Sequence, residues 1–217
     1  FAKFKGSSVG DGNGPNNTFD GTVDPDYFNG GPGDDDISGK GSNDTLIGSE
    51  KGSNDTLIGG KGDDTLTGGN GADTLDGGAG EDTFVYGNGD SGVANGDLSN
   101  MDLISDFNAG DGSAGGTVDK FVVDTGFAPL AATALNEKTV ELNKGNILTN
   151  LKNAFTGTDE SGNTEFQIIN GDGNGDLGER SFLVVDNVDD GNIGTNDLVI
   201  EVTGIAGTFD ENDIVID

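Results

Sequence analysis

Apolar residues in the first part of the chain recur at an almost constant interval, each two positions after an aspartate. The apolar residues are Phe28, Ile37, Leu46, Leu57, Leu66, Leu75 and Phe84. The aspartates are Asp26, Asp35, Asp44, Asp55, Asp64, Asp73 and Asp82. A single apolar residue between polar neighbours predicts a short strand with one side chain facing inward. Such strands at a fixed spacing predict a repetitive all-β structure.

Glycine fills the segments between these strands. The clearest units read GGPGDDDIS, GGKGDDTLT, GGNGADTLD and GGAGEDTFV, beginning at residues 30, 59, 68 and 77. Glycine accepts positive φ angles that side chains with a Cβ resist, so these turns can curl their carbonyl groups inward. Two nonapeptides then complete one coil of roughly eighteen residues. The pattern predicts two stacked parallel sheets around a thin core.

Turns two units apart should lie side by side, which brings oxygen atoms together. Carboxylates and turn carbonyls are the ligands that Ca²⁺ prefers, six or more at a time. Besides the aspartates, the candidate ligands are the glycines of the clear units: Gly30, Gly33, Gly59, Gly62, Gly68, Gly71, Gly77 and Gly80. A flexible Gly- and Asp-rich linker is the alternative. A linker does not require an apolar residue after each evenly spaced aspartate.

The nonapeptide resembles the repeat of the RTX (repeats-in-toxin) calcium-binding β-roll family. The resemblance implies a parallel β-roll with several Ca²⁺ ions in its turns, type I secretion, and folding outside the low-calcium cytosol. It also implies that the sixth-position aspartate is the side-chain ligand in the clear units, namely Asp35, Asp64, Asp73 and Asp82. The units of Asp26, Asp44 and Asp55 read GTVDPD, GKGSND and EKGSND, and they depart from the family pattern.

The repeat loses its spacing once, between Asp44 and Asp55, which stand eleven residues apart. We expect two extra residues near Ser49 and Glu50 to bulge from a turn. One calcium position there should be distorted or missing.

We predict four segments along the chain. Residues 1–20 form a lead-in strand or cap, 21–87 the calcium-binding β-roll, 88–128 its C-terminal cap, and 129–217 a mostly β domain ending in a tail like a type I secretion signal. MDLISDF and VDKFVV in the cap are similar to the segment that follows the repeats in the RTX family. Asp102, Asp106 and Asp119 are candidate calcium ligands there, or else solvated turn carboxylates.

The last segment has fewer glycines and more alternating apolar residues. Ile147 to Phe155 has helical spacing, and it is the one short helix that we expect. Strands are predicted at 166–169, 181–186, 197–204 and 213–217. The sequences RSFLVVDN, NDLVIEVTG and NDIVID resemble the C-terminal tails of cyanobacterial-type secreted RTX proteins.

Two loops in this segment are rich in oxygen ligands. NGDGNGDLGE offers Asp172, Asn174 and Asp176, and we weigh a calcium site there equally against a polar turn. It is not an EF-hand, because Leu177 replaces the required glycine. The second loop, residues 186–197, is predicted to be a hairpin connection rather than a calcium site.

Charge narrows the choice of partners. Forty acidic residues against ten basic ones give a net charge of −30, which opposes contact with nucleic acid or anionic membranes. Only 31% of the residues are hydrophobic, so the metal-free chain is expected to be disordered. No stretch has the length and apolarity of a transmembrane helix. The chain opens at Phe1 rather than Met, so we expect a removed leader or a longer parent protein.

The absence of His and Cys excludes conventional Ser/His/Asp and Cys/His nucleophiles and favours metal sites made of oxygen. We therefore predict a secreted, non-enzymatic calcium-binding protein at the cell surface or in the extracellular matrix. Its role would be structural, as a self-assembling subunit of a filament, sheath or S-layer. The alternative is a calcium-dependent export and folding module of a larger enzyme or toxin. A carbohydrate-binding module is a third hypothesis, which the scarcity of Trp and Tyr disfavours.

Overall fold

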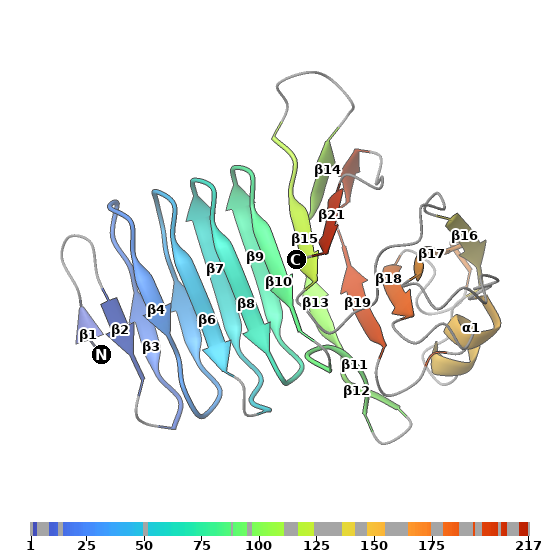
Figure 1. Ribbon diagram of the computed structural model, residues 1–217, viewed down its shortest axis with the longest axis horizontal. Coiled ribbons are helices and arrows are strands. Elements are labelled where there is room, and N and C mark those ends of the chain that lie inside the picture. The colour runs from blue at the N-terminus through green and yellow to red at the C-terminus, as the bar shows by residue number, and fades with distance from the viewer. Residues whose placement is uncertain are drawn as a thin grey trace.

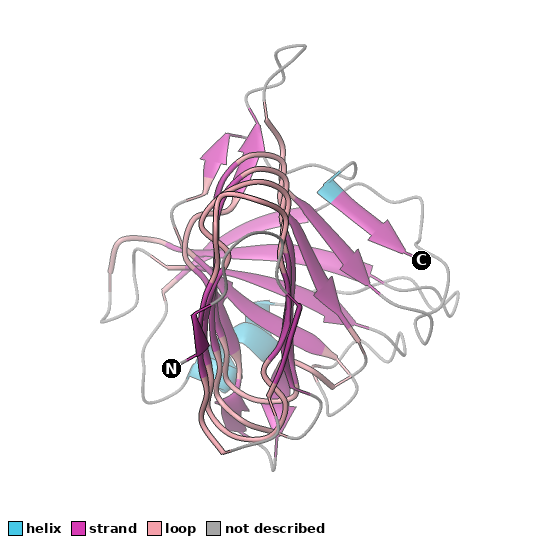
Figure 2. Ribbon diagram, turned by 90° about the vertical axis from the view of Figure 1, so that its left-hand side faces the viewer, coloured by secondary structure: helices cyan, strands magenta, loops and turns pink. Residues whose placement is uncertain are grey.

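A computed structural model describes the repeat region almost continuously and the tail in pieces. The described residues are 2–3, 9–12, 15–49, 52–87, 89–94, 97–110, 117–123, 136–141, 147–154, 165–174, 180–186, 193, 197–203, 205–207 and 213–216. About half of them form strands in two sheets that lie face to face, as the end-on view in Figure 2 shows. Successive coils follow one another along the length of the molecule (Figure 1).

Successive strands of the roll alternate between the two sheets, so each sheet takes every second strand. In spatial order the first sheet comprises β1 (Ala2–Lys3), β3 (Thr18–Asp20), β5 (Asp36–Ser38), β7 (Thr56–Lys61), β9 (Thr74–Ala79), β13 (Asp102–Ile104), β19 (Leu198–Val202), β18 (Ser181–Asp186), β17 (Glu165–Gly171) and β16 (Asn136–Val140). The second comprises β2 (Val9–Asp11), β4 (Tyr27–Asn29), β6 (Thr45–Ser49), β8 (Thr65–Gly69), β10 (Thr83–Tyr86), β15 (Lys120–Val123) and β21 (Ile214–Ile216). We call them the ten-stranded and the seven-stranded sheet.

Parallel pairing places equivalent residues of successive coils beside one another. Leu57 pairs with Leu75 in the first sheet, and Leu46 pairs with Leu66 in the second. The apolar residue of each unit points between the sheets and is almost fully buried, while its two neighbours point outward. This alternation follows from the period of two in a strand, and it confirms the predicted parallel β-roll.

The register survives the irregular spacing between Asp44 and Asp55. Ser49 pairs with Gly69, and the amide of Asp55 reaches the carboxylate of Asp73, so the coil regains its register before Asp55. Gly52 is exposed and has a φ of 73°. Residues 50 and 51 lie outside the described residues, so the predicted bulge stays a prediction.

The tail continues the ten-stranded sheet. Strand β13 pairs with β9 on one side and with β19 on the other, parallel in both cases. Strands β19, β18 and β17 then run antiparallel to one another, and β16 pairs parallel with β17. Roll and tail therefore share the ten-stranded sheet, and the tail strand β21 also extends the seven-stranded sheet beside β15. The segment boundaries at 20, 87 and 128 stay predictions.

Helix α1 (Ile147–Ala154) packs against the tail strands. Its buried residues Leu151 and Ala154 belong to a small apolar cluster with Phe182, Val184 and Val199. The predicted helix is thus confirmed, and among the described residues it is the only one. The predicted strands at 166–169, 181–186, 197–204 and 213–217 correspond to β17, β18, β19 and β21. None of the described helices is long and apolar enough to cross a bilayer.

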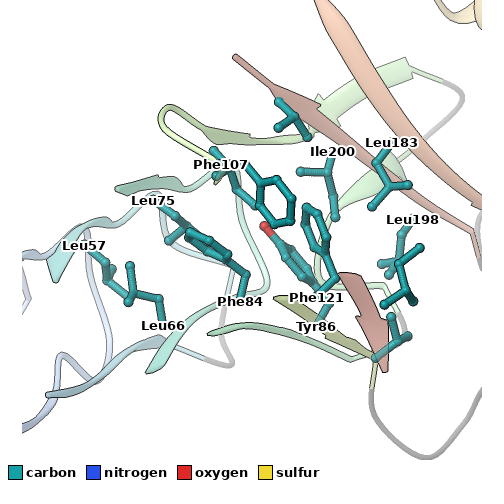
Figure 3. Packing of buried hydrophobic residues seen from close by; sticks show 14 of the residues in the cluster. Leu57, Leu66, Leu75, Phe84, Tyr86, Phe107, Phe121, Leu183, Leu198 and Ile200 are labelled. Carbon is teal, nitrogen blue, oxygen red and sulfur yellow. The ribbon is translucent and has the colours of Figure 1, made fainter. Parts of the chain in front are cut away.

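Two short pairs complete the described elements. The hairpin of β11 (Gly92–Ala94) and β12 (Asp97–Asn100) leaves the roll after β10, and β14 (Asn108–Gly110) pairs with β20 (Ala206–Gly207). Between roll and tail the core is aromatic. Phe107 stacks on Phe121 with ring centroids 4.5 Å apart, and Phe84 and Tyr86 lie against Phe121 (Figure 3). These rings close the end of the thin leucine core.

Candidate metal sites in the turns

The aspartates of the repeats form two ladders, one along each turn edge of the roll. In each ladder the backbone amide of one aspartate donates to Oδ1 of the aspartate in the next coil, as Asp44 does to Asp64 at 2.7 Å. One ladder runs through Asn17, Asp35, Asp55, Asp73 and Asp102. The other runs through Asp26, Asp44, Asp64, Asp82 and Asp119. The repeat spacing therefore brings together all seven predicted aspartates.

The second carboxylate oxygen behaves differently from the first. Oδ2 is buried and has no hydrogen-bond partner in Asp35, Asp44, Asp64, Asp73, Asp82 and Asp102. An ionised carboxylate buried without a partner is strongly destabilising. Repetition of the same orphaned oxygen in successive coils indicates that a cation is the missing partner.

Backbone carbonyl oxygens lie close to these orphaned oxygens. At Gly39, the space that a Cβ would occupy lies against Oδ2 of Asp44 and 2.8 Å from the carbonyl oxygen of Gly59. At Gly59, the same space lies against Oδ2 of Asp64 and 2.6 Å from the carbonyl oxygen of Gly77. The first glycine of a unit therefore leaves room between a carboxylate and a carbonyl from different coils.

The departures from the repeat pattern fall into two kinds. Oδ2 of Asp26 accepts hydrogen bonds from the amide of Thr22 at 2.7 Å and from its hydroxyl at 3.2 Å, and Oδ2 of Asp55 accepts from the hydroxyl of Ser53 at 3.3 Å. Asp44 has an orphaned Oδ2 like the aspartates of the clear units. By this criterion Asp44 fits a metal-ligand role, whereas Asp26 and Asp55 have protein donors.

The turn containing Asp44 keeps the geometry of the other turns although two of its positive-φ positions hold residues with a Cβ. Lys40 and Ser42 have φ angles of 81° and 75°, and they occupy the places that Gly60 and Gly62 occupy in the next coil. Among the predicted glycines, the fourth of each clear unit has positive φ as expected: Gly33, Gly62, Gly71 and Gly80. The first of each unit instead faces the carboxylate of its own unit: Gly30, Gly59, Gly68 and Gly77.

Without a cation these carboxyl groups hold their protons unusually tightly. Burial raises the pKa of Asp64 and Asp73 to about 7, and that of Asp44, Asp55 and Asp82 to about 6. The ladder hydrogen bonds act in the opposite direction, and the neighbouring aspartates add to the increase. A divalent cation would offset both burial and repulsion, so the electrostatics favour a bound cation at neutral pH.

The three aspartates predicted in the cap lie at the end of the roll in distinct roles. Asp102 continues the first ladder and has an orphaned Oδ2. Asp119 continues the second, but its Oδ2 accepts from the amide of Asn108 at 2.8 Å. Asp106 accepts from the amides of Gly77 and Gly78. Their metal binding stays a prediction. Asp102 has an unbonded Oδ2 like the repeat aspartates, but its carboxylate also interacts with the buried hydroxyl of Tyr86.

The sequence pattern missed four residues of the ladders. Asn17 forms an additional rung, eighteen residues before Asp35, and its side chain also donates to the carbonyl oxygen of Gly30 at 3.1 Å. The sequence Asn17-Thr18-Phe19 copies the Asp-Thr-apolar motif with an amide, and this signal identifies the rung. Ser91 closes the first ladder by accepting from the amide of Asp102 at 2.8 Å. No local sequence signal marks Ser91, Thr22 or Ser53.

The loop after β17 is only partly described. The amide of Asn174 donates to Oδ1 of Asp172 at 2.9 Å, and both residues are exposed. Asp176 lies outside the described residues. A calcium site in this loop therefore stays a prediction.

The donor set of the roll suits a hard cation. Throughout the described ranges, no three acidic side chains gather as a carboxylate-only site would need. The ladders instead offer carboxylate oxygens at two edges together with glycine carbonyls. Oxygen ligands of mixed kind in a flexible geometry are typical of Ca²⁺ rather than of metals that prefer nitrogen or sulfur. The residues present therefore fit calcium.

Comparison with known proteins agrees with this chemistry. The family model described as RTX calcium-binding nonapeptide repeat (4 copies) matches residues 11–46 and 51–84. No match was found among curated protein sequences. A similar solved structure is that of the AlgE6R3 subunit from the Azotobacter vinelandii mannuronan C5-epimerase. It is 19% identical, with a TM-score of 0.43, and the match covers 97% of this chain and 80% of that chain.

Proposed function

We propose that this chain, whose residues 11–46 and 51–84 are RTX calcium-binding nonapeptide repeats, is a secreted, non-enzymatic protein that folds around calcium outside the cell. Its role is structural: it assembles with copies of itself into a filament, sheath or lattice at the cell surface or in the extracellular matrix. Calcium is the cofactor that holds the roll together and allows acidic subunits to approach one another.

One observation is the main support for calcium-dependent folding. Five aspartates of the repeats (Asp35, Asp44, Asp64, Asp73 and Asp82) each leave one buried oxygen without a partner, and at Asp44 and Asp64 the glycine turns place a carbonyl oxygen near it. The thin core contributes one buried apolar side chain per nonapeptide, which is little against the ordering of nine residues. Sites of extracellular modules have dissociation constants of roughly 10⁻⁴ to 10⁻³ M. Such sites fill outside the cell and stay empty in the cytosol, which supports secretion before folding.

Two features of the surface support self-assembly. Strands β2 and β21 are the edges of the seven-stranded sheet, and β1 is an edge of the ten-stranded sheet. Unpaired strand edges can add a strand from a second chain. The second feature is charge: the described outward side chains of β4, β6, β8, β10, β15 and β21 include no acidic residue. They are Tyr27, Asn29, Thr45, Ile47, Thr65, Thr67, Thr83, Val85, Lys120, Val122 and Val215.

The opposite surface of the roll is acidic. Asp20, Asp36 and Asp76 point outward from the ten-stranded sheet. In a chain with a net charge of −30, the seven-stranded sheet is therefore the face on which two copies approach with the least repulsion. Calcium bound in the turns and salt in the medium lower the remaining repulsion.

A non-enzymatic role follows from the chemistry that the carboxylates already perform. Apart from Asp106, which accepts from two glycine amides, the aspartates with raised pKa values belong to the ladders, where Oδ1 accepts from a backbone amide. The chain has no His and no Cys to provide a nucleophile or its base.

Far-UV circular dichroism and static light scattering across a calcium titration test both parts of the proposal. We expect β structure to appear in the millimolar range, with an increase in mass that EGTA reverses and electron microscopy shows as ordered assemblies. A chain that is fully folded in EGTA would contradict the calcium dependence. A folded monomer at saturating calcium would contradict assembly and favour the alternative, an export and folding module of a larger enzyme or toxin.

A further inference from the structure

The roll ends at β13, and at that point a side chain takes the place of the next coil. In the preceding coils the amide of each first glycine donates to a backbone carbonyl one coil further on. Gly21 donates to Ser38, and Gly39 donates to Ile58, each at 2.8 Å. The amide of the second turn position does the same, from Lys40 to Gly59 at 2.8 Å. These hydrogen bonds link each turn to the equivalent turn of the next coil.

The turn at Gly77 has no such neighbour. Leu103 and Ile104 pair with Thr74 and Leu75, so Asp106 stands in register with Gly77, in the place of the next first glycine. There the chain leaves the path of the roll and continues into β14. The amide of Gly77 donates to Oδ1 of Asp106 at 3.0 Å, and that of Gly78 donates to Oδ2 at 2.6 Å.

We propose that Asp106 is the terminal cap of this turn edge, a positioning residue that replaces the two carbonyls of an absent coil. Its two oxygens accept from the same two amides that carbonyls receive in the preceding coils. It therefore fixes the backbone of the last clear unit, Gly77 to Asp82, whose aspartate has an orphaned Oδ2. This inference rests on the proposed calcium-dependent fold, because it assigns a role in holding the last metal-binding turn.

The other turn edge ends in the same way, which supports the inference independently. Gly87 follows β10. Like Gly30, Gly48 and Gly68 before it, it stands at the first position of a turn on that edge, and it is the last to do so. Its amide donates to Oδ2 of Asp90 at 2.6 Å. On both edges, a carboxylate thus accepts the hydrogen bond from the amide of the last first-position glycine. Amides form stronger hydrogen bonds with charged acceptors than with carbonyls. A stronger bond helps to hold the last turn of a repeat stack, which has no further coil to pair with.

Amide hydrogen exchange of the calcium-saturated full chain, measured by NMR, tests the cap directly. In Asp106→Ala we expect exchange at Gly77 and Gly78 to rise about 10- to 100-fold, with Gly59 unchanged. Asp106→Asn keeps a single acceptor oxygen, so protection should be lost at one of the two amides only. Asp90→Ala should affect Gly87 and leave Gly77 and Gly78 protected.

Asp76→Asn is the matched control. Asp76 lies beside Asp106 and raises its pKa, yet it accepts neither glycine amide. Its loss should leave exchange at Gly77 and Gly78 unchanged. Unchanged exchange in Asp106→Ala would overturn the inference, and so would an increase in Asp76→Asn equal to that in Asp106→Asn.

Counting bound ions separates a positioning residue from a ligand. Terbium titration of Asp106→Asn should give the same number of ions as the unaltered chain, with weaker binding of one of them. The loss of a whole ion would make Asp106 a ligand and refute the cap. This outcome stays distinct from the proposed calcium-dependent folding, which fails only if the unaltered chain does not fold on calcium. If Asp106→Ala does not fold, Asp106→Asn alone decides.

Discussion

The amide of Asp44 donates to Oδ1 of Asp64, twenty residues later and 2.7 Å away, while Oδ2 of Asp64 has no partner. The two oxygens of one carboxylate thus have separate tasks. One links successive coils, and the other faces the space beside Gly59, where a cation fits. An asparagine at the same position would keep the first task and lose the second.

Asp64→Asn should therefore change stability in opposite directions with and without calcium. In EGTA it removes an orphaned carboxylate, and the calcium-free fold should become more stable by about 1–3 kcal/mol. With calcium at ten times the dissociation constant, loss of the site should cost about 1.4 kcal/mol. Urea unfolding followed by circular dichroism in both buffers measures both effects.

Asp26→Asn is the control for this pair of measurements. Oδ2 of Asp26 already accepts from Thr22, so the substitution breaks bonds that exist without the metal. It should destabilise the fold in both buffers. A gain in EGTA for Asp26→Asn as large as that for Asp64→Asn would contradict the assignment of Oδ2 as the metal-facing atom.

Much of this arrangement was predictable from the sequence, and the physical reason is repetition. The pairing of Leu57 with Leu75 follows from the nonapeptide spacing, because parallel coils can keep only one register. The ligand role predicted for Asp64 rests on the same spacing and remains to be tested by the Asp64→Asn measurements. Lys40 and Ser42 could not be anticipated in this way. Their positive φ angles are imposed by the neighbouring coils, and local propensity disfavours them.

The end of the roll was the hardest part to predict. Asp106 could be seen in the sequence as a calcium ligand, but its hydrogen bonds to Gly77 and Gly78 depend on where the chain leaves the solenoid. The same applies to β19, which joins the roll's sheet beside β13 from almost one hundred residues away. Such contacts have no periodic signal, because they occur once.

Acidification should stabilise the calcium-free roll. In the fold, burial raises the pKa of Asp64 and Asp73 to about 7, above the ordinary value of 3.8. A carboxyl with a higher pKa in the folded state binds its proton more tightly there. Its contribution to folding is therefore complete below about pH 4 and is lost as the pH rises to about 7. Circular dichroism in calcium-free buffers should show more β structure at pH 5 than at pH 8.

The calcium-saturated chain should show the opposite dependence on pH. Protons compete with the cation for the same oxygens, so the apparent calcium affinity should fall as the pH drops from 8 to 5. Isothermal titration at the two pH values measures this change, with the release of protons on binding as a second signal. An affinity independent of pH would contradict the ladder aspartates as ligands.

Ser42→Gly should stabilise the turn that contains Asp44. Ser42 has a φ of 75°, a conformation that costs a residue with a Cβ roughly 1–2 kcal/mol relative to glycine. Its hydroxyl donates to the carbonyl oxygen of Val23 at 3.1 Å in an exposed position, and the loss of that bond offsets part of the gain. We expect a net gain of about 1 kcal/mol in calcium, measured as a shift of the urea midpoint.

Ser38→Gly is the comparison for this substitution. Ser38 lies in β5 with ordinary strand geometry, where glycine weakens a strand by roughly 0.5–1 kcal/mol. The same chemical change should therefore have opposite signs at the two sites. Destabilisation by Ser42→Gly would show that the turn does not hold Ser42 in the left-handed region.

Gly59→Ala should abolish the adjacent calcium position. The added Cβ would lie against Oδ2 of Asp64 and 2.6 Å from the carbonyl oxygen of Gly77, so it would fill the space where carboxylate and carbonyl meet. Terbium luminescence should report one ion fewer. Gly52→Ala, with nothing within 4 Å of the added atom but a φ of 73°, should lose roughly 1 kcal/mol of stability and no ion.

Val85→Asp should prevent assembly while the roll still folds. Val85 points outward from β10 between Thr67 of β8 and Val122 of β15, in the middle of the face whose described outward side chains, from β4 to β21, include no acidic residue. A negative charge there makes that face resemble the opposite one, and two copies with a net charge of −30 would then repel each other on both faces.

Thr74→Asp is the control, because it places the same charge on the outward face of β9, in the sheet that already carries Asp36 and Asp76. We expect light scattering in calcium to give monomers for Val85→Asp and assemblies for Thr74→Asp, with equal circular dichroism. Equal assembly of both variants would exclude the seven-stranded sheet as the contact face and leave the strand edges β1, β2 and β21 as the remaining candidates.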